Sequence, residues 1–192
     1  GAFDIAAFQN GTIFDVFTVS ADKAAGCNQT ADNFQTVTEN GCGENFHRCV
    51  FDVRGNVIGF GGRKMSGDGP KYYNSPDTPV FKKTKNLFAL NFAKKQKLER
   101  LILCEGYMDV IAMHQAGFTE AVASLGTSLT SDQCRLASSY VDEAVLAYDS
   151  DEAGQKAANK AMLLLGKVGV EVRVLKMQGA KDPDEFIKKY GK

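Results

Sequence analysis

The chain has 192 residues, of which 44% are hydrophobic, 24% charged and 10% aromatic, and its 23 basic side chains balance its 23 acidic ones. This composition is typical of a folded globular protein and excludes an intrinsically disordered chain. No apolar run approaches the roughly 20 residues that a membrane helix needs, no signal peptide is visible, and five cysteines without tight spacing do not indicate a disulfide framework. We therefore expect a cytoplasmic protein without a membrane partner.

The N-terminal part of the sequence gives weak structural signals. Residues 1–46 carry few charges and are rich in asparagine, threonine, glycine and alanine, and the stretch 26–43 is typical of loops and turns. The sequence assigns this segment no clear fold or role. Two apolar runs then surround the turn 54–56, which predicts a β-hairpin over residues 49–60.

Basic residues gather in the middle of the chain, where residues 86–100 are predicted to form a helix. The net charge is −4 over residues 1–62, +7 over residues 63–100 and −3 over residues 101–192. A basic segment beside an acidic one suits a protein that grips a polyanion with one part and metal ions with another. A lysine-rich surface that is merely solvated explains the same charges, and both interpretations stay open here.

Strand and helix patterns alternate over residues 101–190. Short apolar runs predict strands at residues 101–104, 121–124, 144–148 and 170–175. Helices are predicted at residues 108–115, 131–140, 152–166 and 184–190, with Thr130 or Ser131 as the N-cap of the second. This alternation is typical of βαβ units and a mostly parallel sheet.

Acidic residues follow three of these four strands. In open parallel sheets, sites form at the carboxyl ends of the strands, so these residues are predicted to meet at one edge. They are Glu105 and Asp109 after the first strand, Asp149 and Asp151 after the third, and Asp182 and Asp184 after the fourth. Residues i and i+2 of an extended backbone point to the same side, which suits the second pair, and a proline between the members of the third pair favours a helix start there.

Two interpretations of these carboxylates compete. Each motif alone fits helix capping, because acidic residues are common at helix N-termini. Six carboxylates at one edge would repel one another, however, and a divalent cation removes that cost. Ligation by oxygen alone suits Mg²⁺ or Mn²⁺ rather than zinc. Gly106 fits either a simple turn or a close approach of the backbone to a phosphate or metal.

The same segments resemble a known family. Glu105-Gly106-Tyr107-Met108-Asp109, Asp149-Ser150-Asp151 and Asp182-Pro183-Asp184 resemble the three signature motifs of the Toprim fold. The residues from Ala123 to Ser128, from Val57 to Arg63 and from Pro70 to Pro76 are similar to the bacterial replicative primases. The resemblance covers residues 50–190. Among proteins with a Toprim fold, it favours the bacterial replicative primases.

The resemblance implies a DNA-dependent RNA polymerase that makes short RNA primers. The six carboxylates would hold two or more Mg²⁺ or Mn²⁺ ions, with Glu105, Asp149 and Asp151 as the catalytic residues. A basic cleft and the glycine of the first motif would contact phosphates of the DNA template, the RNA primer or the ribonucleoside triphosphates. The residues implied for these contacts are Arg63, Lys71, Asn74, Lys83 and Gly106. The resemblance also implies a bacterial or phage origin and, in full-length members, a replicative helicase as partner.

The expected architecture is α/β in three parts. Residues 101–192 would form a Toprim-like parallel-sheet domain with helices on both faces, preceded by a smaller basic α+β subdomain at residues 47–100 and by the segment 1–46 of unclear fold. The family's zinc ribbon and helicase-binding module find no counterpart in the sequence, and Cys27, Cys42, His47 and Cys49 are not spaced as that ribbon is, so no zinc is expected. An inactive DNA-binding remnant and a Toprim nuclease are the alternatives in function.

Overall fold

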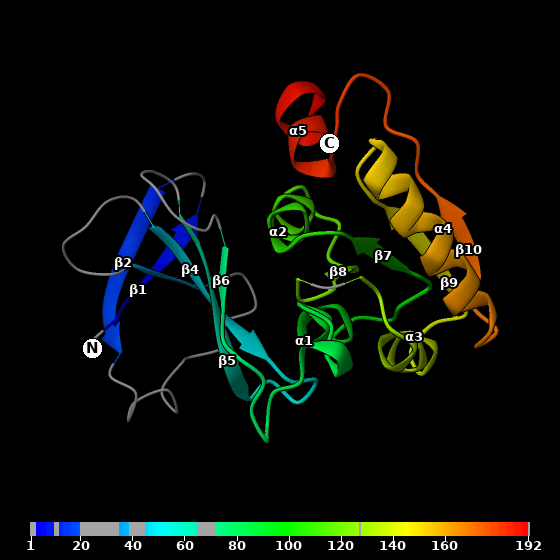
Figure 1. Ribbon diagram of the computed structural model, residues 1–192. Helices are drawn as coiled ribbons and strands as arrows, with labels where there is room; N and C mark the ends of the chain where they lie inside the picture. The colour runs from blue at the N-terminus through cyan, green and yellow to red at the C-terminus, as the bar shows by residue number, and fades with distance from the viewer. Residues whose placement is uncertain are drawn as a thin grey trace. The chain divides into compact units, whose positions relative to one another are not determined.

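The structure is a computed structural model that describes residues 3–9, 12–19, 35–38, 45–64, 72–126 and 128–191. Side chains are described for residues 48–63, 72–126 and 128–191. The chain divides into two compact units, the N-terminal unit Gly1–Val80 and the C-terminal unit Phe81–Lys192 (Figure 1). Residues 81–100, which the sequence grouped with the basic segment, therefore lie in the C-terminal unit. The functional division into three segments stays a prediction.

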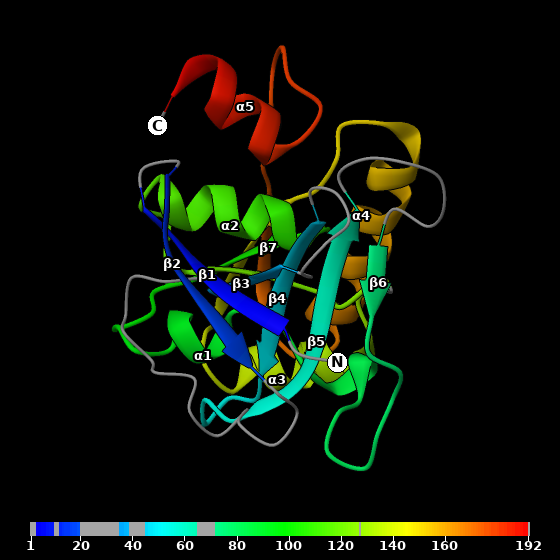
Figure 2. The same cartoon turned by 90° about the vertical axis from the view of Figure 1, so that its left-hand side faces the viewer.

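The N-terminal unit contains an antiparallel sheet of six strands, with the order β2-β1-β3-β4-β5-β6 (Figure 2). Its strands are β1 (Phe3–Gln9), β2 (Thr12–Val19), β3 (Gln35–Thr38), β4 (Asn45–Phe51), β5 (Val57–Lys64) and β6 (Tyr72–Asn74). The predicted hairpin is confirmed as β4 and β5. Its turn is closed by the hydrogen bond from the Gly55 amide to the Asp52 carbonyl at 3.0 Å, and Gly55 has a φ of 93°, which glycine adopts without strain.

The C-terminal unit contains a parallel sheet of four strands, as the alternating pattern predicted. The strands β7 (Leu101–Cys104), β8 (Ala121–Ala123), β9 (Glu143–Ala147) and β10 (Glu171–Val174) have the order β10-β9-β7-β8. The helices are α2 (Tyr107–Gln115), α3 (Ser131–Ser138), α4 (Glu152–Gly166) and α5 (Pro183–Tyr190). The Thr130 hydroxyl accepts a hydrogen bond from the Gln133 amide at 3.2 Å and is the N-cap of α3.

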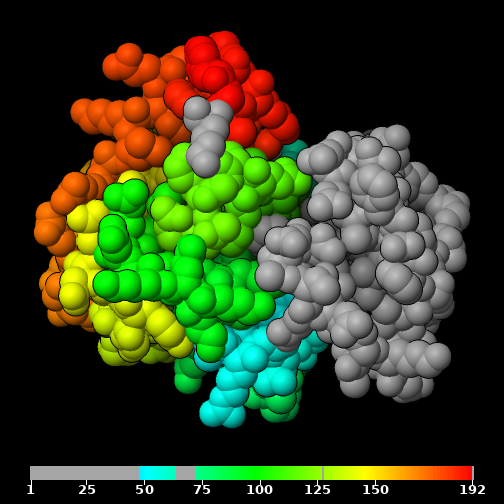
Figure 3. All heavy atoms as spheres, turned by 180° about the vertical axis from the view of Figure 1, so that it is seen from behind, coloured from blue at the N-terminus to red at the C-terminus, as the bar shows by residue number. Residues whose placement is uncertain are grey.

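Helices cover both faces of this sheet. The connection from β7 to β8 through α2 runs towards the β8 edge of the sheet. The connections from β8 to β9 through α3 and from β9 to β10 through α4 run towards the β10 edge. Because such crossovers are right-handed, α2 lies on one face and α3 and α4 on the other. Accordingly α3 packs on α4, and α5 packs on α2, where its atoms lie directly on those of α2 in Figure 3.

The core of the C-terminal unit lies around the strands β7, β8 and β9. Leu101 and Leu103 of β7, Val122 of β8 and Leu146 of β9 are fully buried. Strand β10 lies at the edge, where Val174 is 45% exposed. The buried strands are continuous apolar runs, as expected for a parallel sheet covered on both faces.

The predicted helix over residues 86–100 is largely wrong. Only the short helix α1 (Leu90–Ala93) forms there, after the short 3₁₀ helix η2 (Lys83–Lys85). Phe88 instead lies extended beside β8 and exchanges two backbone hydrogen bonds with Ala123, at 2.8 and 3.3 Å. Ala89 then adopts a left-handed φ of 67°, so the pairing of Phe88 with the sheet sets where the helix begins.

Candidate active site

Acidic side chains lie at the carboxyl ends of three strands of the parallel sheet. Glu105 directly follows β7, Asp149 follows β9 after one intervening residue, and Asp182 ends the segment between β10 and α5. Because all four strands are parallel, these positions lie at one edge of the sheet. The structure therefore forms the edge that the sequence predicted.

A hydrogen bond joins the ends of β7 and β9. The Asp149 amide donates to Glu105 Oε1 over 3.1 Å, so the Glu105 carboxylate lies beside the start of the loop 149–151. Gly154, in the first turn of α4, packs against the same place, and a Cβ atom there would lie 2.7 Å from Glu105 Oε1. This close packing keeps Glu105 next to Asp149.

Helix capping, the alternative that competed with metal binding, accounts for part of the acidic set. Asp151 is the N-cap of α4 and its Oδ1 accepts from the Gly154 amide at 2.9 Å, while Asp182 is the N-cap of α5 and accepts from the Glu185 amide at 2.8 Å. Asp184 forms an ion pair with Lys188 at 2.6 Å. Capping uses only the Oδ1 oxygen of Asp151. Its Oδ2 oxygen instead lies 3.4 Å from the ammonium of Lys181.

The electrostatics show that these carboxylates act on one another. Burial raises the pKa of Glu105, and the charge of Asp149 raises it further. Burial also raises the pKa of Asp149, although the neighbouring ammonium of Lys181 opposes the rise. Asp109 is 8% exposed, and burial together with the charges of Asp182 and Asp149 raises its pKa to about 7. Acidic groups from all three predicted motifs thus act on one another, and at Asp109 the neighbouring charges add to the larger effect of burial.

We expect the substitution Asp109→Asn to stabilise the chain at pH 8 in the presence of a chelator. The pKa of Asp109 is raised from 3.8 to about 7 on folding, so its favourable contribution is complete below about pH 4 and is lost as the pH rises through 7. A neutral side chain avoids that loss, which gives a gain of about 1–3 kcal/mol in unfolding free energy at pH 8 and little gain near pH 4. Urea denaturation at both pH values measures it, with Asp142→Asn, at an exposed position, as control. An equal effect at both pH values would contradict the assignment.

A lysine that the sequence reasoning did not single out lies in the acidic set. Lys181 Nζ is 3.3 Å from Asp149 Oδ2 and 3.4 Å from Asp151 Oδ2. The sequence signal was a basic residue directly before the Asp-Pro-Asp motif. Because its ammonium lies between these two oxygens, Asp149 and Asp151 are placed so that both can contact one cation.

The donor chemistry fits Mg²⁺ or Mn²⁺, because every candidate ligand is a carboxylate oxygen. Among the residues with described side chains, however, no three histidine, cysteine or acidic side chains surround a point closely enough to hold an ion as they stand. Hydrogen bonds and ion pairs within the set occupy several of the oxygens. An ion would therefore have to replace some of these contacts.

The predicted nucleic-acid residues are spread over both compact units. In the N-terminal unit, Arg63 lies 5.6 Å from the centre of the Tyr72 ring, and Asn74 Oδ1 accepts from the guanidinium of Arg48 at 3.2 Å. Arg48 is 2% exposed and was not among the predicted residues. In the C-terminal unit, the Lys83 carbonyl accepts from the buried side chain of Gln133 at 3.0 Å. Lys71 lies outside the described residues.

Gly106 is the N-cap of α2, and its amide donates to Asp109 Oδ2 over 3.3 Å. Its φ of −120° is open to any residue, so backbone conformation does not require a glycine. A Cβ atom would instead lie 3.2 Å from Asp109 Oδ2. The glycine therefore lets the Asp109 carboxylate approach the end of β7.

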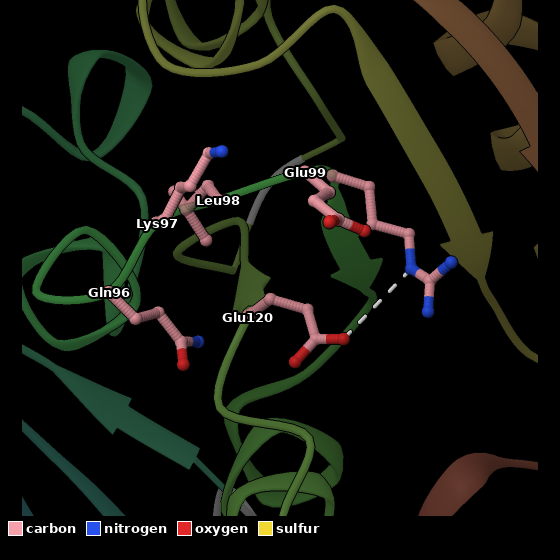
Figure 4. A pocket seen from close by; sticks show the side chains of 6 residues that line it. Gln96, Lys97, Leu98, Glu99 and Glu120 are labelled. Atoms are coloured by element: carbon pink, nitrogen blue, oxygen red, sulfur yellow. Dashed lines mark ion pairs between the residues drawn. The ribbon is translucent and has the colours of Figure 1, made fainter.

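Two pockets differ in their relation to this edge. One of about 250 Å³ includes Glu105, Ser124 and Tyr148 in its lining and so opens beside the acidic residues. The other, of about 190 Å³, lies at the amino ends of β7 and β8, where Arg100 and Glu120 form an ion pair at 4.0 Å (Figure 4). Only the first borders a predicted site residue.

Comparison with known proteins identifies both halves of the chain. Residues 102–187 match the family model of Toprim-like domains, and residues 27–94 match that of the N-terminal domain of the DNA primase catalytic core. A DNA primase of Clostridium acetobutylicum is 49% identical over 144 residues, which are 74% of this chain and 24% of that protein. The chain thus spans about a quarter of the length of the curated relatives that it matches.

Solved structures agree with the sequence relatives. The zinc-binding and RNA polymerase domains of the Aquifex aeolicus primase match with a TM-score of 0.73 and 45% identity, over 77% of this chain and 37% of that one. A DnaG primase catalytic domain bound to single-stranded DNA matches with a TM-score of 0.71 and 41% identity, over 78% of this chain and 50% of that one. In the part of the chain that the structure describes, no helix is long and apolar enough to cross a membrane. With its primase-type N-terminal match, its Toprim-like sheet and its acidic strand ends, the chain belongs to the bacterial DNA primase family and covers part of the catalytic core.

Proposed function

We propose that this chain supplies the nucleotidyl-transfer centre of a primase, which synthesises short RNA primers on single-stranded DNA for replication. The observation that carries the proposal is the convergence of Glu105, Asp109 and the Asp149–Asp151 pair at one edge of a Toprim-like sheet. The hydrogen bond between the Asp149 amide and Glu105 supports it, as do the charges of Asp182 and Asp149, which together with burial raise the pKa of Asp109. The relatives named above, DNA primases that share up to 49% identity with it, support the reaction class.

The carboxylates would hold two or more Mg²⁺ or Mn²⁺ ions. The proposed ligands are Glu105, Asp109, Asp149, Asp151, Asp182 and Asp184. When bound, such ions lower the pKa of the attacking 3′ hydroxyl and stabilise charge on the pyrophosphate leaving group. Glu105 is the proposed acceptor of the hydroxyl proton, because its pKa is raised by burial and its second oxygen, Oε2, is not the acceptor of the Asp149 amide.

Basic and polar residues would position the nucleic acid and the nucleotides. Arg63, Lys71, Asn74 and Lys83 are proposed to contact phosphates of the template, the RNA primer and the ribonucleoside triphosphates, and Gly106 allows the backbone to approach them. Phosphate contacts of this kind weaken steeply with salt, since binding releases condensed counterions. For the full-length protein, the proposal extends to a replicative helicase as partner.

Extension of an RNA primer annealed to a single-stranded DNA template tests the function. We expect the chain to incorporate labelled ribonucleotides with Mg²⁺ or Mn²⁺, and to stop when EDTA removes the ion, because carboxylates alone leave the phosphate charge unneutralised. The template labelled at its 5′ end is followed in the same reaction. Cleavage of the template without incorporation would establish a Toprim nuclease instead. Binding of DNA and Mn²⁺ without either reaction would establish a remnant that lacks catalysis.

A further inference from the structure

The ammonium of Lys181 occupies the position between two proposed metal ligands. It lies within 3.3 Å of Asp149 Oδ2 and 3.4 Å of Asp151 Oδ2, and the three side chains are 55%, 21% and 47% exposed. Both aspartate oxygens thus face a positive charge that belongs to the protein itself. An ammonium is a compact point charge with three donors, so it can satisfy two carboxylates at once.

Backbone contacts place Lys181 beside the aspartate pair. Its carbonyl accepts from the Ser150 amide at 2.9 Å and from the Ser150 hydroxyl at 3.0 Å, and Ser150 lies between the two aspartates in sequence. Its amide donates to Glu185 Oε2 over 2.9 Å. The loop before α5 is therefore fastened to the loop before α4, and the side chain of Lys181 starts within reach of both aspartates.

We propose that Lys181 is a resident counter-ion of the Asp149–Asp151 pair, which a divalent cation must displace to bind there. This inference rests on the metal site of the proposed function. Mg²⁺ takes carboxylate oxygens at about 2.1 Å, and an ammonium facing the same oxygens would repel the ion and compete for their lone pairs. The lysine thus keeps two like charges together without metal and lowers the affinity for the ion that replaces it.

Mn²⁺ binding, followed by the electron paramagnetic resonance signal of the free ion, tests the displacement. We expect Lys181→Met to bind Mn²⁺ about two- to tenfold more tightly than the unaltered chain, since it removes two partly exposed ion pairs. Lys181→Arg keeps the charge and can bridge both carboxylates, so its affinity should not exceed that of the unaltered chain. The control is Lys160→Met, which removes the same charge from an exposed position on α4 and should leave the affinity unchanged.

Thermal unfolding gives a second readout that does not depend on activity. Without metal, Lys181→Met should unfold about 1–4 °C below the unaltered chain, because Asp149 and Asp151 lose their counter-ion. With saturating Mn²⁺ the difference should vanish. Equal Mn²⁺ affinity of the unaltered chain and Lys181→Met, or weaker binding by the variant, would overturn the inference alone. Absence of Mn²⁺ binding in all the proteins would overturn the metal site of the proposed function and the inference with it.

Discussion

Replacement of Asp149 by asparagine is expected to lower ribonucleotide incorporation by about 100-fold or more. The substitution keeps the size of the side chain but removes a charged oxygen that would bind a metal ion and balance its charge. Because the backbone amide of Asp149, not its side chain, donates to Glu105, that hydrogen bond remains in the variant. The loss would therefore come from the missing carboxylate rather than from a displaced Glu105.

Single-nucleotide extension of an annealed primer at saturating Mg²⁺ measures this effect. The matched control is Asp142→Asn, which makes the same exchange at the amino end of β9, where Asp142 is exposed and contributes its carbonyl to the Glu171 amide. We expect the control to keep its activity within about twofold, because surface substitutions away from a site have small effects. Undiminished activity of Asp149→Asn, with the chain shown to be folded by circular dichroism, would remove this residue from the proposed mechanism.

A second large effect is expected from a single methyl group at Gly154. In Gly154→Ala, the added Cβ would lie 2.7 Å from Glu105 Oε1 and 2.8 Å from the carbonyl carbon of Asp149, and it would also meet the Asp149 carbonyl oxygen. Most of these atoms belong to the backbone and cannot rotate away. We expect a loss of about 2–4 kcal/mol in unfolding free energy, from forced shifts in a packed region.

The same helix offers a control for this substitution. Gly166 ends α4, and a Cβ atom there would find nothing within 4 Å. Gly166→Ala should therefore stabilise the chain by about 0.5–1 kcal/mol through the higher helix propensity of alanine. Urea denaturation of both variants compares them directly. Similar stabilities for the two would mean that α4 does not pack against the Glu105–Asp149 contact as described.

The sequence predicted most of the C-terminal unit because its signals are local. Helix α4 and strand β7 have the predicted limits, since an amphipathic run and a short apolar run between clear breaks define them. The failure over residues 86–100 has a non-local cause. Phe88 pairs with Ala123, far along the chain, and no local pattern reports that partner. The strands β1, β2 and β3 were not predicted either, because the low charge and the loop-like composition of residues 1–46 indicated no clear fold.

The position of the acidic residues at the carboxyl ends of the strands was predictable in the same way, whereas their roles stay a prediction. The rule that sites follow the carboxyl ends of parallel strands was enough to select Glu105, Asp149 and Asp182. What it could not give is the detail of the loops. Asp151 caps α4 with one oxygen while the other faces Lys181, and that division depends on the hydrogen bonds between Ser150 and the segment 180–181.

The pairing of Phe88 with β8 has a consequence for how such a protein can be rearranged during evolution. The N-terminal family match ends at residue 94, yet its last part, from Phe81 on, folds with the Toprim-like sheet: Phe81 and Leu90 are buried there, and the ring of Phe88 lies 6.1 Å from that of Tyr107. Recombination between the two matched segments would remove the residues that pack against strand β8 at the edge of the sheet. If the Toprim-like sheet is joined to other domains during evolution, residues 81–94 should therefore stay with it. The unit that is inherited is then longer than the segment 102–187 that matches the Toprim-like family.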